Sequence, residues 1–139
     1  MRTKRDSTQK GIALLLSAIV LGVLIAFVGM AVDLGYFLST RSQMQTAADL
    51  AALAGARELA AGRPAAYIEQ SARADAALNG AAHQNEATLV KVEATGGRVA
   101  VEIRRDAPTF FSRILGRNEM TLVSRAAAQP VGGEVALVE

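Results

Sequence analysis

The most apolar stretch of the chain is residues 12–32, where 21 consecutive positions carry no charged side chain. As an α-helix such a run is roughly 31 Å long at about 1.5 Å per residue, which matches the hydrocarbon core of a bilayer. It therefore predicts a transmembrane helix, with a buried core helix as the alternative. A cleaved secretory signal, cut near Gly29-Met30-Ala31, is a second alternative, although the apolar region of a signal is usually only about 7–15 residues long.

The pattern then becomes helical and rich in alanine over residues 33–62, without proline and with Gly62 placed to end the helix. Large apolar side chains are sparse there, and Phe37, Met44 and Ala51 recur at a spacing of seven, as in a helix-packing seam. A helix surface with few large side chains and many alanines suits close packing against another helix. Packing against the head of the same chain is an equally weighted alternative.

Residues 63–85 are predicted to hold a second helix, begun by Pro64, and a polar connector. The connector contains His83, the only histidine of the chain. A single histidine in a connector is expected to be solvated and not to bind a ligand.

Apolar and polar positions alternate after the connector, which predicts two strands joined by a two-residue turn at Gly96-Gly97. The turn fixes the register, in which apolar side chains meet on one face and opposite charges on the other. The expected pairs are Ala94 with Val99, Val92 with Val101, Val90 with Ile103, and Lys91 with Glu102.

A short helix is predicted to begin at Asp106 and Pro108, to cap the sheet and to stop at Gly116. Its apolar face is formed by Phe110, Phe111, Ile114 and Leu115. A third strand follows over residues 120–126. Residues 86–130 thus form a small head, and residues 131–139 a flexible tail. The predicted fold class is α+β: an N-terminal transmembrane helix that continues as a long helix, then a head with a β-hairpin, a short helix and a third strand.

The charges that flank the apolar run predict its orientation. Four basic residues and one acid precede the run, whereas Asp33 follows it directly and the first basic residue beyond is Arg41. By the positive-inside rule the tail, residues 1–11, is cytoplasmic and the C-terminal domain is periplasmic or extracellular. The membrane-orienting residues are Arg2, Lys4, Arg5 and Lys10.

The same charges explain the overall balance. The formal net charge is +2, and the first ten residues alone contribute +3, so the remainder carries −1. The basic character therefore belongs to the anchor and is no footprint of nucleic-acid binding. Aromatic residues are few and tryptophan is absent, which further weakens a base-stacking surface.

The sequence contains no recognisable catalytic or metal-binding pattern. Cysteine is absent, which removes disulfides, thiolate catalysis and cysteine-based metal sites. There is no phosphate-binding loop, no histidine pair and no nucleophile elbow. We therefore expect no enzyme activity, no cofactor, no metal and no small-molecule substrate; a small hydrolase or metalloenzyme is the least favoured hypothesis.

Small residues line one face of the apolar run at a 4-4-3 spacing, which lets a second membrane helix approach closely. The stripe leads to Asp33 at the outer boundary, which is either a polar contact to a neighbouring subunit or a hydrated end-of-span residue. The candidate partner-packing residues are Ala18, Gly22, Ala26, Gly29, Asp33, Phe37, Met44, Ala48, Ala51 and Gly55.

These motifs resemble the TadE/TadG-like family of the tight-adherence (Flp) pilus assembly system. The resemblance covers about residues 5–60 and is carried by a basic start, an apolar span, a boundary motif and an alanine-rich helix. The matching segments are Arg5 to Lys10, Ala31-Val32-Asp33-Leu34-Gly35, Arg41-Ser42-Gln43-Met44-Gln45 and Ala47-Ala48-Asp49-Leu50-Ala51-Ala52-Leu53-Ala54-Gly55-Ala56. The later segment from Pro108 to Gly116 is similar with lower specificity.

The resemblance implies a single-pass protein of the bacterial inner membrane with a pilin-like helix. It would act in pilus biogenesis or related secretion as a minor pilin-like subunit or an assembly factor, with other pilus-assembly proteins or a second copy as partners. Two features depart from the family: no von Willebrand factor A-like domain is present, and the fifth residue after Gly11 is Leu16, where a prepilin has glutamate. The alternative function is a membrane-tethered periplasmic binding or scaffolding module unrelated to pili.

Overall fold

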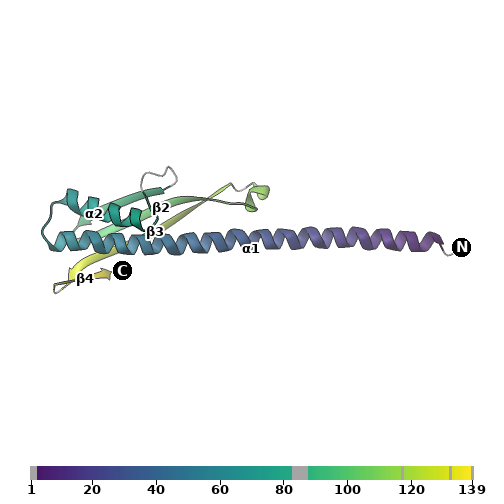
Figure 1. The fold of residues 1–139 in the computed structure, drawn as a ribbon, viewed down its shortest axis with the longest axis horizontal. Coiled ribbons are helices and arrows are strands. Elements are labelled where there is room, and N and C mark those ends of the chain that lie inside the picture. The colour runs from purple at the N-terminus through teal and green to yellow at the C-terminus, as the bar shows by residue number, and fades with distance from the viewer. Residues whose placement is uncertain (1–2, 83–87, 117, 132, 139) are drawn as a thin grey trace.

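A computed structural model describes residues 3–82, 88–116, 118–131 and 133–138, with side chains described throughout except at 3–9 and 115. One very long helix carries a small head at its C-terminal half (Figure 1). The elements in chain order are α1 (Thr3–Ala60), α2 (Ala65–Leu78), β1 (Thr88–Thr95), β2 (Arg98–Pro108), the 3₁₀ helix η1 (Ser112–Leu115), β3 (Glu119–Val131) and β4 (Glu134–Val138).

Helix α1 runs for 58 residues without a break. It contains no proline, and its second half is rich in alanine, the best helix former. It ends in a left-handed turn at Gly62 (φ +68°), where the N–H of Arg63 binds the carbonyl oxygen of Glu58 at 3.0 Å. Pro64 then prevents the helix from continuing in line and starts α2.

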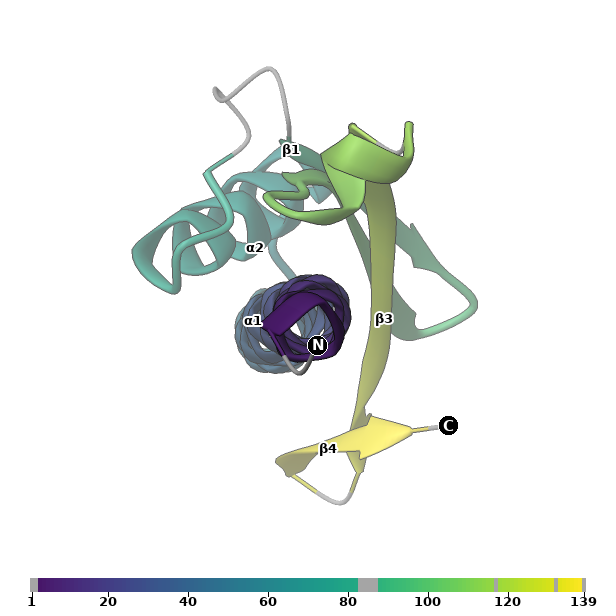
Figure 2. The ribbon, with the colours of Figure 1, turned by 90° about the vertical axis from the view of Figure 1, so that its right-hand side faces the viewer.

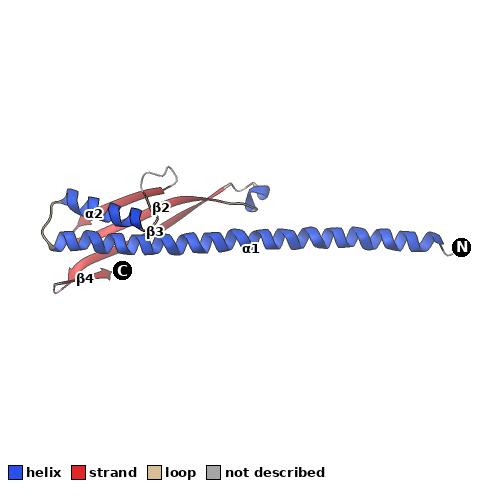
Figure 3. Cartoon of the chain, viewed as in Figure 1, coloured by secondary structure: helices blue, strands red, loops and turns tan. Residues whose placement is uncertain are grey.

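Among the described residues, α1 is the one helix long and apolar enough to cross a membrane, and its apolar window is not buried against any other part of the chain. A soluble protein rarely leaves such a surface uncovered. The expected fold class, an α+β head on a long helix with an apolar N-terminal half, is therefore confirmed (Figure 3).

The strands form one antiparallel sheet in the order β1-β2-β3-β4. Strands β1 and β2 pair in the expected register, with Val92 opposite Val101 and Lys91 opposite Glu102. The glycines of the turn have φ values of +63° and +78°, which are easily reached only without a Cβ atom.

The short helix differs from the prediction. Asp106 and Pro108 lie within β2, opposite Thr121 and Glu119 of β3, and the helical turn is confined to Ser112–Leu115. Strand pairing continues to Pro108 because its missing N–H costs nothing at a strand end. The helix that the sequence predicted across these residues is therefore one 3₁₀ turn.

The flexible tail is also corrected. Strand β3 extends through Pro130 to Val131, and Glu134–Val138 return as β4 alongside it. Gly133 (φ +93°) lies in the connection between the two strands. Val135 packs against the core, so the apolar residues of this segment give it a reason to be ordered.

The core lies between the alanine-rich half of α1, helix α2 and the concave face of the sheet. Seen along its axis, α1 has α2 on one side, the sheet on another and β4 below (Figure 2). Alanines of α1 allow the helix to lie close to the sheet, where Val99, Val101 and Ile103 are almost fully buried. Met44 is the largest fully buried side chain.

Candidate functional site

The exposed half of α1 is the first part of the candidate site. Large apolar side chains from Ile12 to Val32 project away from the chain all round the helix, and about half or more of each is accessible. Exposure of this kind is stable in hydrocarbon and costly in water. The helix therefore has the length and the exposed apolar surface that a membrane anchor needs.

Asp33, at the end of this half, binds a loop that is far away in the sequence. Its Oδ1 accepts the N–H of Phe110 at 3.0 Å and that of Phe111 at 3.3 Å. Its Oδ2 accepts the N–H groups of Phe111 at 3.1 Å and Ser112 at 2.7 Å, and the Ser112 hydroxyl at 2.8 Å. One carboxylate thus caps three consecutive backbone donors and fixes residues 109–116, here called the junction loop, against α1.

These contacts lower the pKa of Asp33. Burial by itself raises the pKa of the carboxyl group, but the hydrogen bonds from Ser112, Phe110 and Phe111 together outweigh burial and lower the pKa from 3.8 to about 2. Asp33 is therefore ionised at neutral pH.

Two further contacts close the junction. Phe111 lies so close to Gly29 that a Cβ atom there would be 2.4 Å from the Phe111 Cγ atom. The rings of Tyr36 and Phe110 meet edge to face, with centroids 5.6 Å apart and an interplanar angle of 80°. The absence of a side chain at Gly29 therefore leaves the space that the Phe111 ring of the same chain occupies.

Apolar grooves lie beside the junction loop. One of about 300 Å³ is lined by Gly22, Ile25, Ala26, Met30, Phe111 and Ile114, among others. A second, of about 230 Å³, lies toward the head and is bordered by Leu34, Phe37 and Met120. Both grooves are suited to hydrocarbon and not to a polar ligand.

The candidate packing residues divide between two environments. Phe37 is half-buried, Met44, Ala48 and Ala51 are fully buried, and Gly55 lies where an added Cβ atom would be 2.9 Å from Val99. All five face the head of the same chain. Gly29 and Asp33 face the junction loop, whereas Ala18, Gly22 and Ala26 remain exposed. A partner helix on the stripe stays a prediction.

Lys10 is exposed at the start of the apolar half. Arg2 and His83 lie outside the described residues, as do the side chains of Lys4 and Arg5. The arrangement of the basic tail and the role of the histidine therefore stay as the sequence predicts them.

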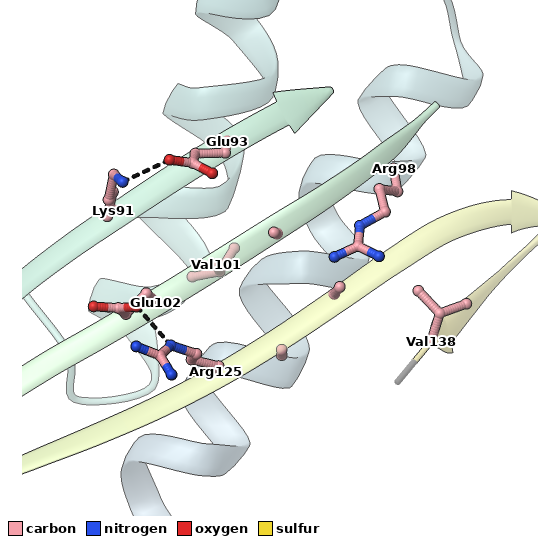
Figure 4. Close-up of a pocket in the computed structure, with 10 residues that line it drawn as sticks. Lys91, Glu93, Arg98, Val101, Glu102, Arg125 and Val138 are labelled. Carbon is pink, nitrogen blue, oxygen red and sulfur yellow. Dashed lines mark hydrogen bonds and ion pairs between the residues drawn. The ribbon is translucent and has the colours of Figure 1, made fainter. Parts of the chain in front are cut away.

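The outer face of the sheet carries a charged groove of about 350 Å³ (Figure 4). The Lys91 ammonium lies 2.6 Å from the Glu93 carboxylate, and the Arg125 guanidinium donates to Glu102 at 2.6 Å. The hydrogen bond to Glu93 raises the pKa of Lys91, and the same bond lowers the pKa of Glu93. Glu102 is opposite Lys91, as expected, but pairs with Arg125, which lies directly across from it on β3.

Sequence reasoning missed the contact between Asp33 and the junction loop, because 77 or more residues separate the partners. It also missed Gln45, whose side-chain amide donates to Asp49 at 2.9 Å and to the Arg125 carbonyl oxygen of β3 at 3.1 Å. A glutamine placed between buried positions of an alanine-rich helix was the available signal. Within the described residues, no group of three or more metal-ligating side chains is clustered.

The fold and the exposed helix define a class: an α+β protein in which one continuous N-terminal helix is a candidate membrane span in its first half and the core helix of the head in its second half. Residues 11–58 match the family model described as "Putative Flp pilus-assembly TadE/G-like". Over this segment, about a third of the chain, the sequence is similar to that family, and the resemblance predicted from the sequence is confirmed. No curated protein and no solved structure matches the chain. The match supports involvement in Flp pilus assembly.

Proposed function

We propose that the protein is a single-pass inner-membrane component of Tad/Flp-type pilus biogenesis or a related secretion assembly. It acts as a minor pilin-like subunit or an assembly factor, through helix packing and without enzyme activity. The proposal needs no cofactor, metal or small-molecule substrate. Its partners are the membrane, other pilus-assembly or pilin-like proteins, and a second copy of the same chain.

One observation carries the proposal: the two halves of α1 have opposite surroundings. The N-terminal half is bare and apolar, whereas the second half is enclosed by α2 and the sheet (Figure 2). A subunit built in this way can be stored in a membrane and can present the same bare helix to neighbouring helices in an assembly. The family match covers both halves.

The surface left for a partner helix is narrower than the sequence suggested. Gly29 is covered by Phe111, and the candidate packing residues beyond Asp33, from Phe37 to Gly55, face the head. Ala18, Gly22 and Ala26 remain free for a close approach. We place the partner contact on this part of the stripe, in the inner two thirds of the span.

The proposed orientation follows from charge. The basic tail before residue 12 stays in the cytoplasm and the head lies in the periplasm or outside the cell. A cysteine placed in the head and one placed in the tail separate the two topologies, because a membrane-impermeant thiol reagent added to intact spheroplasts should label only the first. Labelling of the tail cysteine alone contradicts the orientation.

The experiment that tests the role is to shear surface filaments from cells and follow the protein by immunoblot and intact mass. Recovery with the filaments identifies a minor subunit, and the mass shows whether the chain was cut after Gly11. Retention of the full chain in the inner membrane identifies an assembly factor. Normal pilus production in a strain that lacks the protein contradicts both roles.

The charged groove of the outer sheet face is the feature that favours the alternative function, a binding or scaffolding module (Figure 4). Its ion pairs are exposed and so contribute little to stability, which leaves them available to a polar partner. Genes for a secretion ATPase and platform proteins next to this one favour the pilus role. Their absence, together with normal piliation in the deletion strain, favours the module.

A further inference from the structure

The junction loop exposes large apolar side chains although the core of the head is only a few residues away. Ile114 is 83% exposed and Phe110 is 56% exposed, and Phe111 is covered on one side by Gly29. Figure 1 shows that the segment between β2 and β3 reaches farther along α1 toward the N-terminus than the rest of the head. An apolar cluster with this placement indicates a contact surface.

The loop lies against the part of α1 that anchors the protein. Phe111 contacts Gly29, and Ile114 shares a groove with Ile25 and Ala26. At about 1.5 Å per residue, Gly29 and Ala26 lie roughly 6 and 10 Å from Asp33 on the membrane side. Apolar faces of interfacial segments are buried in a bilayer to a depth of about 5–10 Å.

Most backbone N–H groups of the loop have a hydrogen-bond acceptor within the protein. This matters in a medium without water, where an unpaired N–H group is costly. Asp33 accepts the N–H groups of Phe110, Phe111 and Ser112. The N–H groups of Ile114 and Gly116 bind carbonyl oxygens within the loop, and that of Thr109 binds Asn118. Asp33 thus accepts the backbone N–H groups that water would accept in an ordinary surface loop.

The edges of the loop carry groups suited to a membrane surface. Tyr36 packs on Phe110 at the level just outside Asp33, and tyrosine is enriched where lipid meets water. Arg113, exposed within η1, has a side chain long enough to extend its guanidinium to lipid phosphates while its methylene groups stay in the apolar layer.

We propose that the junction loop is a second membrane contact. Phe110, Phe111 and Ile114 enter the outer-leaflet interface beside the span, where lipid acyl chains cover their exposed faces. The inference rests on the proposed membrane span and adds to it a surface that is continuous with the span. The two contacts together set the height and rotation of the head on the bilayer.

The absence of cysteine permits a direct test. Single cysteines at Ile114, Leu24 and Leu78 are labelled with an environment-sensitive fluorophore in full-length protein, and the protein is reconstituted at low density in phosphatidylcholine and phosphatidylglycerol vesicles. Leu24 reports the span. Leu78 is the matched control, because it is 84% exposed on α2, which packs against the alanine-rich half of α1. Quenching by lipids with brominated acyl chains is compared with quenching by aqueous iodide.

We expect brominated lipids to quench the label at Ile114 several-fold more strongly than the label at Leu78, and iodide to show the reverse order. Equal behaviour of Ile114 and Leu78, with Leu24 quenched by lipid, overturns the loop contact and leaves the span intact. A label at Leu24 that lipid does not reach overturns the span and with it the proposed function. Protection of Ile114 from both quenchers overturns lipid as the occupant and identifies a second copy of the chain.

Discussion

At the scale of single residues, Asp33 ties the loop between β2 and β3 to helix α1. Its two oxygens bind three backbone N–H groups and one hydroxyl, all from a loop 77–79 residues later in the chain. The sequence placed this aspartate at the end of the span and suggested a neighbouring subunit or water as its partner. The structure supplies a partner from the same chain, so no neighbour is needed to satisfy the charge.

The attachment of the junction loop should depend on pH through Asp33. The pKa of its carboxyl group in the folded protein, about 2, is below the ordinary value of 3.8, so the stabilisation is complete above about pH 4 and is lost as the pH falls toward 2. A carbon-13 titration of the Asp33 carboxyl in micelles should show a midpoint near 2. A midpoint near 3.8 contradicts the hydrogen-bonded geometry, and Asp33→Asn serves as the variant without this transition.

Gly29 and Gly22 should respond differently to the same change. Gly29→Ala places a methyl group against Phe111 and should release the loop, because a Cβ atom there is 2.4 Å from the ring. Gly22→Ala is the matched control, since nothing lies within 4 Å of its added Cβ atom. Amide chemical shifts of Phe110 to Ser112 should change in the first variant and stay unchanged in the second. Unchanged shifts in both show that Phe111 does not occupy this site.

At the scale of elements, α1 combines two packing surfaces that follow different rules. Its second half packs alanines against valines and an isoleucine of the sheet, and Met44 is its largest fully buried side chain. Its first half is exposed and carries the small residues Ala18, Gly22 and Ala26, which we propose as the contact for a membrane partner. Substitutions in the second half should therefore change the stability of the head, whereas substitutions in the first half should change pilus assembly.

Met44→Ala should weaken the head. Loss of a fully buried methionine side chain costs about 2–5 kcal/mol, because the cavity is only partly refilled. Hydrogen exchange of the β2 amides at Val99 and Ile103 should accelerate by the corresponding factor. Leu38→Ala is the control, since Leu38 is exposed. Equal exchange in the two variants contradicts the packing of α1 in the head.

Replacing Gly22 and Ala26 together with leucine should disrupt pilus assembly and leave membrane insertion intact, because the added side chains keep a partner helix at a distance. The control is Ala13→Leu with Ala31→Leu, which adds the same bulk to the opposite face of the helix. Piliation and membrane fractionation are measured for both pairs. Normal piliation with the first pair shows that the stripe is not the partner surface.

The hairpin could be predicted because its pattern is local in the sequence. Contacts between residues far apart in the sequence could not be predicted. A two-residue turn fixes the register of β1 and β2, because a shift by one residue would turn every apolar side chain outward. Strand β4 was missed because Pro130 resembles the end of ordered structure. In the structure Pro130 lies within β3, opposite Val135 of β4, and the strand accommodates proline there. The junction loop was missed because nothing near Asp33 or Phe111 in the sequence indicates that they meet.

At the scale of the whole molecule, the sequence could not decide where the alanine-rich helix packs. A surface of alanines is equally complementary to a neighbouring helix and to a sheet of valines, so its composition does not select the partner. The structure encloses residues 44–56 with α2 and the sheet of the same chain.

The unbroken course of α1 has a mechanical consequence. Neither proline nor paired glycines interrupt the helix between the anchor and the head, so there is no hinge at the membrane surface. A force that pulls on the anchor along the helix axis is transmitted through the backbone hydrogen bonds of α1 to the core of the head. There it acts parallel to the surface where the alanines contact the sheet, and it does not separate the two surfaces one contact at a time. The anchor and the head are therefore parts of one continuous helix, and a displacement of one end is passed to the other through that helix.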